Sequence, residues 1–185
     1  MLNDVYADAR DRMNKALETL EREYKRLRTG RASISLVDEI RAEYYGVPTP
    51  LNQLSTITVP DPRTIMIQPW DSTVIGEVEK AIHKSDLGLN PTNDGKVIRI
   101  HIPPLTAERR RELVKVIKKM AEEAKVAVRN IRRDVNEMIK ELKKEKEISE
   151  DEQFRAQEEI QKITDDFIKR IDGVYGIKEK EILEI

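Results

Sequence analysis

The sequence predicts an α+β protein in which a long antiparallel three-helix bundle carries a small inserted mixed α/β domain. Apolar residues recur at steps of three and four near both ends of the chain, a spacing typical of long amphipathic helices. Between these ends, most of the prolines and most of the β-branched runs occur, which indicates short strands and turns. We therefore expect a discontinuous bundle made of residues 1–30 and 105–185, with the α/β domain at 31–104.

The first helix is expected from about Leu2 to Leu27. Its apolar stripe has steps of three, four or seven residues and consists of Ala9, Met13, Ala16, Leu20 and Leu27. Thr29 and Gly30 should end the helix, because glycine is the usual residue in the left-handed turn that follows one.

The middle domain should contain several short strands and one short helix. The strands are expected where β-branched and aromatic residues predominate, at 41–45, 55–59, 64–68 and 97–102. The spacing of apolar residues predicts a helix over 74–84. Residues 46–50 should break the first strand, 60–62 should form a turn, and 89–95 should form a loop, because proline and glycine are concentrated there.

From Thr106 the pattern is helical to the end of the chain. The second helix should reach about Glu145, with an apolar seam formed by Val114, Ile117, Ala121, Ala124, Val128, Ile131, Val135, Met138 and Leu142. It should break near Ile148, because Ser149 and Glu152 have the spacing of a capping box that starts the third helix. The third seam consists of Ile160, Ile163, Phe167, Ile171 and Val174. The first helix has a matching stripe, so a three-helix bundle would cover all the seams.

Charge is unevenly distributed along a chain that is nearly neutral, with 34 Lys and Arg against 35 Asp and Glu. Residues 106–146 contain fourteen basic and eight acidic residues, whereas 147–185 contain six basic and twelve acidic ones. One interpretation is intramolecular, with exposed ion pairs between neighbouring antiparallel helices. This interpretation explains the overall segregation better than it explains residues 125–133, which contain four cations and no acid.

The cations of this run should share one face of the second helix. At about 100° per residue, one stripe beside the apolar seam holds Lys125, Arg129, Arg132, Asn136 and Lys140, with Arg133 at its edge. Side chains there can rest their aliphatic stems on apolar surface while their charged heads face outward. Arginine also forms forked contacts with phosphate and stacks on bases. The stripe therefore predicts contact with a nucleic acid. Because no aromatic residues are interleaved, structured RNA is favoured over a single strand.

Several other function classes lack their motifs. The chain has no cysteine, no Gly-x-x-x-x-Gly-Lys phosphate loop, no His-x-x-x-His pair and no Gly-x-Ser-x-Gly elbow. We expect the two histidines, His83 and His101, to be surface residues of the α/β domain, and Trp70, Tyr44 and Tyr45 to be core or turn anchors. No apolar run approaches the ~20 residues needed to span a bilayer. We therefore expect a cytoplasmic protein that is not an enzyme and has no cofactor, metal or membrane partner.

Five segments spread along the chain form a further pattern. They are Arg28-Thr-Gly-Arg-Ala-Ser33, Glu43-Tyr-Tyr-Gly-Val-Pro-Thr-Pro-Leu-Asn-Gln-Leu54, Ser85-Asp-Leu-Gly-Leu-Asn-Pro91, Pro103-Pro-Leu-Thr-Ala-Glu-Arg-Arg110 and Val126-Ala-Val-Arg-Asn-Ile-Arg-Arg-Asp134. In sequence and order they resemble the motifs of the ribosome recycling factor family. The resemblance covers the chain end to end and implies an L-shaped monomer with roughly the outline of tRNA.

The resemblance also implies a function. Such factors bind the post-termination ribosome and, together with elongation factor G and GTP, split it into subunits and free the mRNA. It implies that Arg129 and Arg132 contact large-subunit rRNA, and it matches Arg28 to another basic position near the end of the bundle. We expect Arg133 and Lys125, which share the stripe or its edge, to bind rRNA as well.

The mechanism implied by the resemblance is mechanical. The bundle would anchor on rRNA while elongation factor G pushes on the hinged α/β domain, with GTP hydrolysis left to that partner. The two-strand hinge is expected at Thr29, Gly30 and Arg31 on one strand and at Pro103, Pro104 and Leu105 on the other.

Two other classes stay open. A structural coiled-coil adaptor would bind a partner protein through its helices and would show no salt-dependent affinity for RNA. A small RNA chaperone or hydrolase would act on free RNA without ribosomes. Heptads report packing and not partner, so they do not exclude the adaptor; the α/β insert with its specific loops argues against it.

Overall fold

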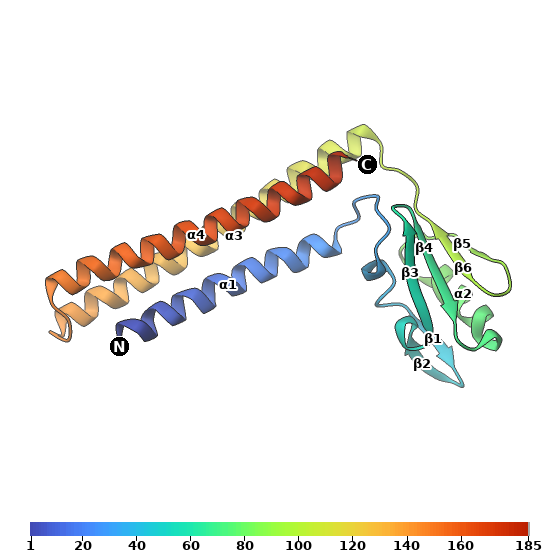
Figure 1. Ribbon diagram of the computed structural model, residues 1–185, viewed down its shortest axis with the longest axis horizontal. Coiled ribbons are helices and arrows are strands. Elements are labelled where there is room, and N and C mark those ends of the chain that lie inside the picture. Colours follow the sequence, from blue (N-terminus) through green and yellow to red (C-terminus); the bar gives the residue numbers. More distant parts are fainter. Residues whose placement is uncertain (185) are drawn as a thin grey trace. The chain divides into compact units, whose positions relative to one another are not determined.

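The structure, a computed structural model, describes residues 1–184. Its internal contacts divide the chain into two units, one made of Met1–Leu27 and Arg110–Glu184 and the other of Arg28–Arg109. The first unit is helical and the second holds both β-sheets, as Figure 1 shows. The α+β class predicted from the sequence, with a three-helix bundle and a smaller α/β unit, is confirmed.

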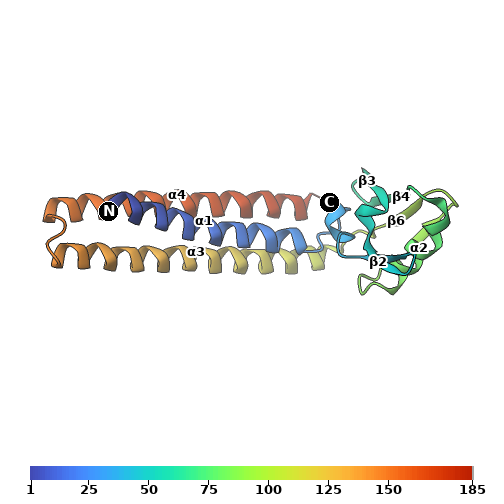
Figure 2. The ribbon, with the colours of Figure 1, turned by 90° about the horizontal axis from the view of Figure 1, so that it is seen from below.

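The bundle consists of α1 (Leu2–Arg26), α3 (Ala107–Lys144) and α4 (Glu150–Leu183). Figures 1 and 2 show α3 and α4 running antiparallel, with α1 alongside both and parallel to α4. Side-chain contacts agree with this arrangement. The Arg12 guanidinium of α1 lies 2.7 Å from a carboxylate oxygen of Asp134 on α3. The Arg10 guanidinium lies 3.3 Å from a carboxylate oxygen of Glu159 on α4.

The buried face of each helix follows the predicted seam with local shifts. In α1, Leu17 is buried where Ala16 was expected, and in α3, Ile139 is buried whereas Met138 is 45% exposed. A straight α-helix has 3.6 residues per turn, so a strict seven-residue pattern drifts by about 20° per heptad relative to the core. Over a helix as long as α3, this drift moves the buried position by one residue.

The loop between α3 and α4 is closed by the predicted capping box. The Ser149 hydroxyl accepts a hydrogen bond from the Glu152 amide at 3.2 Å, and the Glu152 carboxylate accepts one from the Ser149 amide at 2.7 Å. The hydrogen bond from the Ser149 amide lowers the pKa of Glu152. The buried Ile148 side chain covers this end of the bundle. These contacts satisfy two of the amides that every helix N-terminus leaves unpaired.

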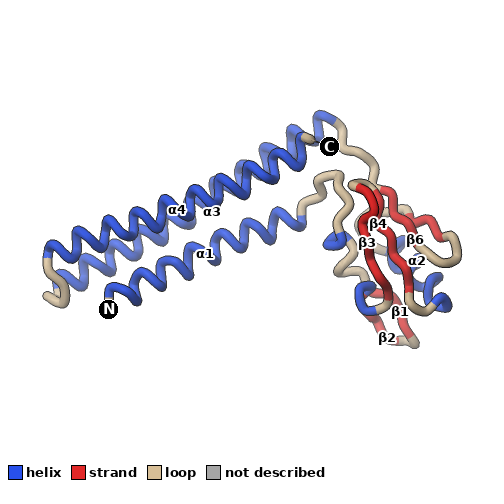
Figure 3. Tube along the Cα trace, viewed as in Figure 1, coloured by secondary structure: helices blue, strands red, loops and turns tan. Residues whose placement is uncertain are grey.

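The second unit contains one four-stranded antiparallel sheet and one two-stranded hairpin, shown in red in Figure 3. The large sheet has the order β3 (Ser55–Asp61), β4 (Thr64–Pro69), β6 (Ile98–His101) and β5 (Pro91–Asn93). The hairpin pairs β1 (Arg41–Tyr44) with β2 (Val47–Pro50). Helix α2 (Ile75–Lys84) buries Val78 and Ile82 in a core shared with Ile65 and Ile100 of the large sheet.

Two segments expected to be irregular contain strands instead. Residues 46–50 were expected to break the first strand, but Val47–Pro50 form β2, and the expected loop at 89–95 contains β5. Both are short edge strands, each paired with a single neighbour. Proline has no amide hydrogen to donate, so within a sheet it is tolerated mainly at edges. The prolines therefore mark edge strands here, whereas sequence reasoning interpreted them as breaks.

The chain enters and leaves the second unit beside one turn. The Ala32 amide donates to the Pro62 carbonyl, and the Ile102 amide donates to the Arg63 carbonyl, both at 2.7 Å. Gly30 has a positive φ of 77°, and a Cβ added there would lie only 2.9 Å from Leu105 Cγ. The six residues expected to form the hinge all fall in this unit, and their role as a hinge stays a prediction.

Candidate nucleic-acid interface

The predicted basic stripe lies on α3, directly beside the buried face of that helix. Val128 and Val135 are fully buried and fix the rotation of this segment. With these two valines in the core, Arg129 and Arg132 are half-buried at its border and Arg133 is exposed. Arginines at the border of a buried face can rest their aliphatic stems on apolar surface while their charged ends face outward.

Lys125 is held by carboxylates on two helices. Its ammonium lies 2.5 Å from Asp172 of α4 and 3.4 Å from Glu122 of α3, and only 15% of its side chain is exposed. The hydrogen bond to Asp172 is the main cause of a raised pKa for Lys125. The charge of Lys125 is therefore largely balanced within the bundle, as the intramolecular interpretation of the charge pattern expects.

Arg132 has a neutral partner. Its Nη1 donates a hydrogen bond to the Gln161 side-chain carbonyl at 3.2 Å. The other end of the Gln161 amide donates to an Asp165 carboxylate oxygen at 2.8 Å. Arg132 is thus held in place without a direct ion pair among the residues that the structure describes.

The side chains of Arg129 and Arg133 make neither a hydrogen bond nor an ion pair within residues 1–184. Their guanidinium donors are available to an external acceptor. Farther along the stripe, Lys140 is paired with Glu137 on its own helix at 2.6 Å, and the buried Oδ1 of Asn136 has no hydrogen-bond partner among the described residues. The three arginines therefore carry the uncompensated positive charge of the stripe.

Arg28 lies in the other unit from the stripe. It is exposed and lines a small pocket of about 230 Å³ together with Gly30, Arg31 and a group of apolar side chains. The site residues predicted from the sequence are therefore split, with four on α3 and one in the α/β unit.

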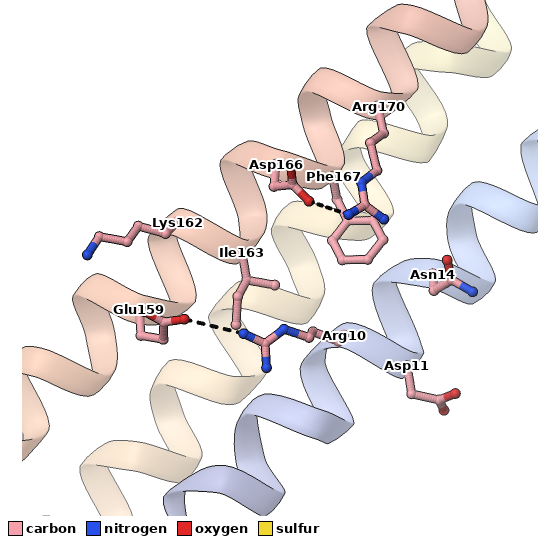
Figure 4. A pocket seen from close by; sticks show the side chains of 9 residues that line it. All are labelled: Arg10, Asp11, Asn14, Glu159, Lys162, Ile163, Asp166, Phe167 and Arg170. Carbon is pink, nitrogen blue, oxygen red and sulfur yellow. Dashed lines mark hydrogen bonds and ion pairs between the residues drawn. The ribbon is translucent and has the colours of Figure 1, made fainter.

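A second surface of the bundle, between α1 and α4, differs in its charge. This groove has a volume of about 500 Å³ and is lined by three basic and three acidic side chains as well as Asn14, Ile163 and Phe167. Figure 4 shows these side chains. Arg10 pairs with Glu159 at 3.3 Å, and Arg170 pairs with Asp166 at 2.8 Å while lying over the Phe167 ring. Because its charges balance internally, this groove suits a polyanion less well than the stripe does.

The partners of the stripe on α4 were not identified from the sequence. Along the chain, Gln161 and Asp165 lie about thirty residues from Arg132, and Asp172 lies farther than that from its partner Lys125. The only available signal was the acidic composition of residues 147–185, which predicts pairing in general but does not select the pairs.

The histidines and aromatic residues considered as candidates from the sequence belong to the α/β unit. Within the described part of the chain, no group of three or more His, Cys, Asp or Glu residues could hold a metal ion. His83 and His101 are exposed, as expected. Trp70 is 67% exposed and so is not a core anchor, although its ring nitrogen donates to the Thr56 hydroxyl at 2.8 Å. Tyr45 is 82% exposed at the hairpin turn.

Among residues 1–184, no helix combines the length and the apolar character needed to cross a bilayer.

Comparison with known proteins places these features in context. A family model described as "Ribosome recycling factor" matches residues 20–183. The ribosome-recycling factor of Syntrophobacter fumaroxidans is 80% identical over the whole of both chains, and that of Desulfatibacillum aliphaticivorans is 59% identical over the same span. A solution structure of a ribosome recycling factor superposes with a TM-score of 0.78 at 50% identity and covers 100% of this chain and 98% of its own.

A second solved structure adds a molecular setting. It is described as models for the T. thermophilus ribosome recycling factor and the E. coli elongation factor G bound to the E. coli post-termination complex. It superposes with a TM-score of 0.66 at 51% identity and covers 99% of each chain.

Proposed function

The chain belongs to the ribosome recycling factor family, and on this basis we propose that it binds the post-termination ribosome and, with elongation factor G and GTP, splits it into subunits. The release of mRNA for a new round of translation follows from that splitting. Its place of action is the cytoplasm, where ribosomes terminate, and it acts as a monomer. The solved relative that is described on a post-termination complex with elongation factor G supports the proposal.

The single observation that carries the proposal is the uncompensated charge of the α3 stripe. Arg129 and Arg133 have no acidic partner among residues 1–184, and Arg132 is held by a neutral amide. Folded RNA presents a dense array of phosphates, for which arginine is the preferred forked donor. We propose that these three arginines contact large-subunit rRNA.

The two remaining basic residues contribute differently. The Lys125 ammonium must leave or share two carboxylates to reach a phosphate, so we expect it to add least to RNA affinity. Arg28 is exposed in the α/β unit and would provide a separate contact.

The hinge supplies the mechanical part of the proposal. Thr29–Arg31 and Pro103–Leu105 are the two chain segments through which force on the α/β unit would reach the bundle. Gly30 packs against Leu105, which would make the two segments move together. Elongation factor G would push on the α/β unit and would hydrolyse the GTP, because this chain contains no phosphate loop.

Binding to purified large ribosomal subunits tests the proposed site. Arg132→Ala should weaken binding by roughly tenfold or more, since a charge-assisted contact is lost. Lys180→Ala is the matched control, because Lys180 is an exposed basic residue of α4 that pairs with Glu184, the residue that follows the helix. Equal affinities of the two variants would contradict the assignment of the interface. A coiled-coil adaptor would not prefer the large subunit over a partner protein. An RNA chaperone would not prefer the large subunit over free RNA.

A further inference from the structure

Two residues of α4 form a hydrogen-bonded chain that ends on Arg132. The Asp165 carboxylate accepts from Gln161 Nε2 at 2.8 Å, and Gln161 Oε1 accepts from Arg132 Nη1 at 3.2 Å. We propose that Gln161 and Asp165 are positioning residues that hold the Arg132 guanidinium ready for an RNA phosphate. This inference rests on the proposed function, because it assumes that Arg132 binds rRNA.

Asp165 decides which end of the Gln161 amide faces Arg132. A carboxylate only accepts hydrogen bonds, whereas a glutamine side chain has a donor end and an acceptor end. With Nε2 turned toward Asp165, the carbonyl end is left for the arginine, which only donates. Gln161 and Asp165 are four residues apart on one helix, so they lie on neighbouring turns of the same face. Asp165 therefore fixes the direction of both hydrogen bonds, from Arg132 to Gln161 and from Gln161 to Asp165.

The neutrality of Gln161 matters because it orients Arg132 without cancelling its charge. Lys125 shows the alternative, since the carboxylates of Asp172 and Glu122 hold it and balance its charge. A guanidinium has five N–H donors in a planar fork, and the structure commits one of its nitrogens to Gln161. The remaining donors can form a forked contact with phosphate.

The expected benefit is a smaller loss of side-chain freedom on binding. An unrestrained arginine must be ordered when the complex forms, and that ordering weakens binding. An arginine already held by Gln161 in the free protein avoids part of this loss. Removing the restraint should therefore weaken binding by roughly three- to tenfold, which is less than removing Arg132 itself.

The test measures affinity for purified large ribosomal subunits over a range of salt concentrations, with the full-length protein. Gln161→Met keeps a long neutral side chain, but its thioether is only a weak hydrogen-bond acceptor and replaces the amide carbonyl poorly. It should weaken binding by roughly three- to tenfold and leave the salt dependence unchanged, because the charge of Arg132 remains. Gln157→Met is the matched control: Gln157 lies one turn earlier on α4 and has no hydrogen bond to Arg132 in the described chain.

Gln161→Glu provides a second signature. A carboxylate at this position would pair with Arg132 and compete with phosphate, so the salt dependence should fall by about one charge, as for Arg132→Ala. Gln157→Glu places the same charge one turn away and should change the salt dependence less.

A double-mutant cycle separates positioning from a general structural effect. In the Arg132→Ala background, Gln161→Met should have no further effect on affinity, because the residue that it positions is gone. A Gln161→Met protein that binds as tightly as wild type or more tightly, or one that weakens binding equally in both backgrounds, overturns the positioning role. If Arg132→Ala itself binds normally, the proposed rRNA contact fails and the positioning role fails with it. A normal Gln161→Met beside a weakened Arg132→Ala removes only the positioning role.

Discussion

The Lys125 ammonium lies 2.5 Å from an Asp172 carboxylate oxygen, so one cation of the basic stripe is tied to the neighbouring helix. Arg129 and Arg133, on the same part of α3, have no such partner within residues 1–184. Residues that look alike in the sequence therefore have different surroundings in the fold. We expect them to divide their roles, with Lys125 stabilising the bundle and the arginines binding RNA.

Replacement of Lys125 by methionine should lower the stability of the bundle and leave RNA binding nearly intact. The variant loses a cross-helix ion pair whose lysine is mostly shielded from water, at a cost of about 1 kcal/mol in the free energy of unfolding. Urea unfolding measures this loss. Lys118→Met, on an exposed part of α3, is the control and should be close to neutral. A large drop in affinity for the large subunit with unchanged stability would show instead that Lys125 binds RNA and does not stabilise the bundle.

The bundle should lose stability at alkaline pH through Tyr24. This side chain is buried and donates to the Ile117 carbonyl at 2.6 Å, and burial raises its pKa to about 12. Because the folded pKa lies above the usual value of 10, the contribution is complete below about pH 10 and is lost as the pH rises toward about 12. Tyr24→Phe cannot ionise, so its free energy of unfolding should fall less over this interval.

Tyr175 must be considered in the same experiment. Its hydrogen bond with Glu179 raises its pKa to about 12 as well, so part of the alkaline loss should persist in Tyr24→Phe. Urea unfolding of Tyr24→Phe, of Tyr175→Phe and of the double variant across this pH range measures how much of the alkaline loss of stability each tyrosine causes. Identical pH profiles for wild type and Tyr24→Phe would show that Tyr24 does not contribute.

The capping box should stabilise the turn from α3 into α4. Ser149→Ala removes the acceptor for the Glu152 amide and should lower the free energy of unfolding by about 1 kcal/mol. The Glu152 pKa is lowered by its hydrogen bond from the Ser149 amide. Its contribution is therefore present above the usual carboxyl pKa and is lost as the pH falls through the lower folded value. Glu152→Gln, which keeps a side-chain acceptor but has no carboxylate charge, should remove this acid dependence in urea unfolding.

Gly30→Ala should impair subunit splitting more than it impairs binding to the ribosome. The positive φ of 77° disfavours any side chain by about 1–2 kcal/mol, and the added Cβ would also displace Leu105. Gly46→Ala is a matched control, because Gly46 has the same φ but nothing within 4 Å of the added atom. Both variants should lose stability, but only Gly30→Ala should slow splitting.

Leu105→Ala offers a check on that explanation. If the contact with Leu105 causes the defect, removing its side chain should relieve Gly30→Ala and leave Gly46→Ala unchanged. Splitting rates from light scattering show whether Leu105→Ala restores splitting by the Gly30→Ala protein. A splitting rate for Gly30→Ala equal to that of Gly46→Ala would count against a special role of this contact. Proline is a poorer probe at position 30, because its φ is fixed near −65° and would distort the segment outright.

The long helices were predictable because their signals are local and repeated. The capping residues Ser149 and Glu152 lie three positions apart, and their pattern alone marked the start of α4. The edge strand β2 was missed because Pro48 and Pro50 look like breaks unless the neighbouring strand is known. Which residue of a seam is buried at the far end of α3, Met138 or Ile139, depends on accumulated helix geometry that a fixed heptad pattern does not follow.

The candidate site was predictable in position but not in detail. Clustering of Arg129, Arg132 and Arg133 on one helix is a sequence property. Whether a given cation is neutralised depends on residues of α4 that are distant in the chain, such as Gln161 and Asp172. Helix register and the rotation of two helices decide those contacts. Neither quantity can be obtained from composition or spacing alone.

Light scattering of post-termination ribosomes shows whether the protein takes part in subunit splitting. The protein is mixed with these ribosomes, elongation factor G and GTP at moderate salt, and each component is omitted in turn. We expect a fall in scattering that needs all three additions and that requires a higher concentration of Arg132→Ala than of wild type. No fall with an active elongation factor, or equal performance of Arg132→Ala and wild type, would contradict it.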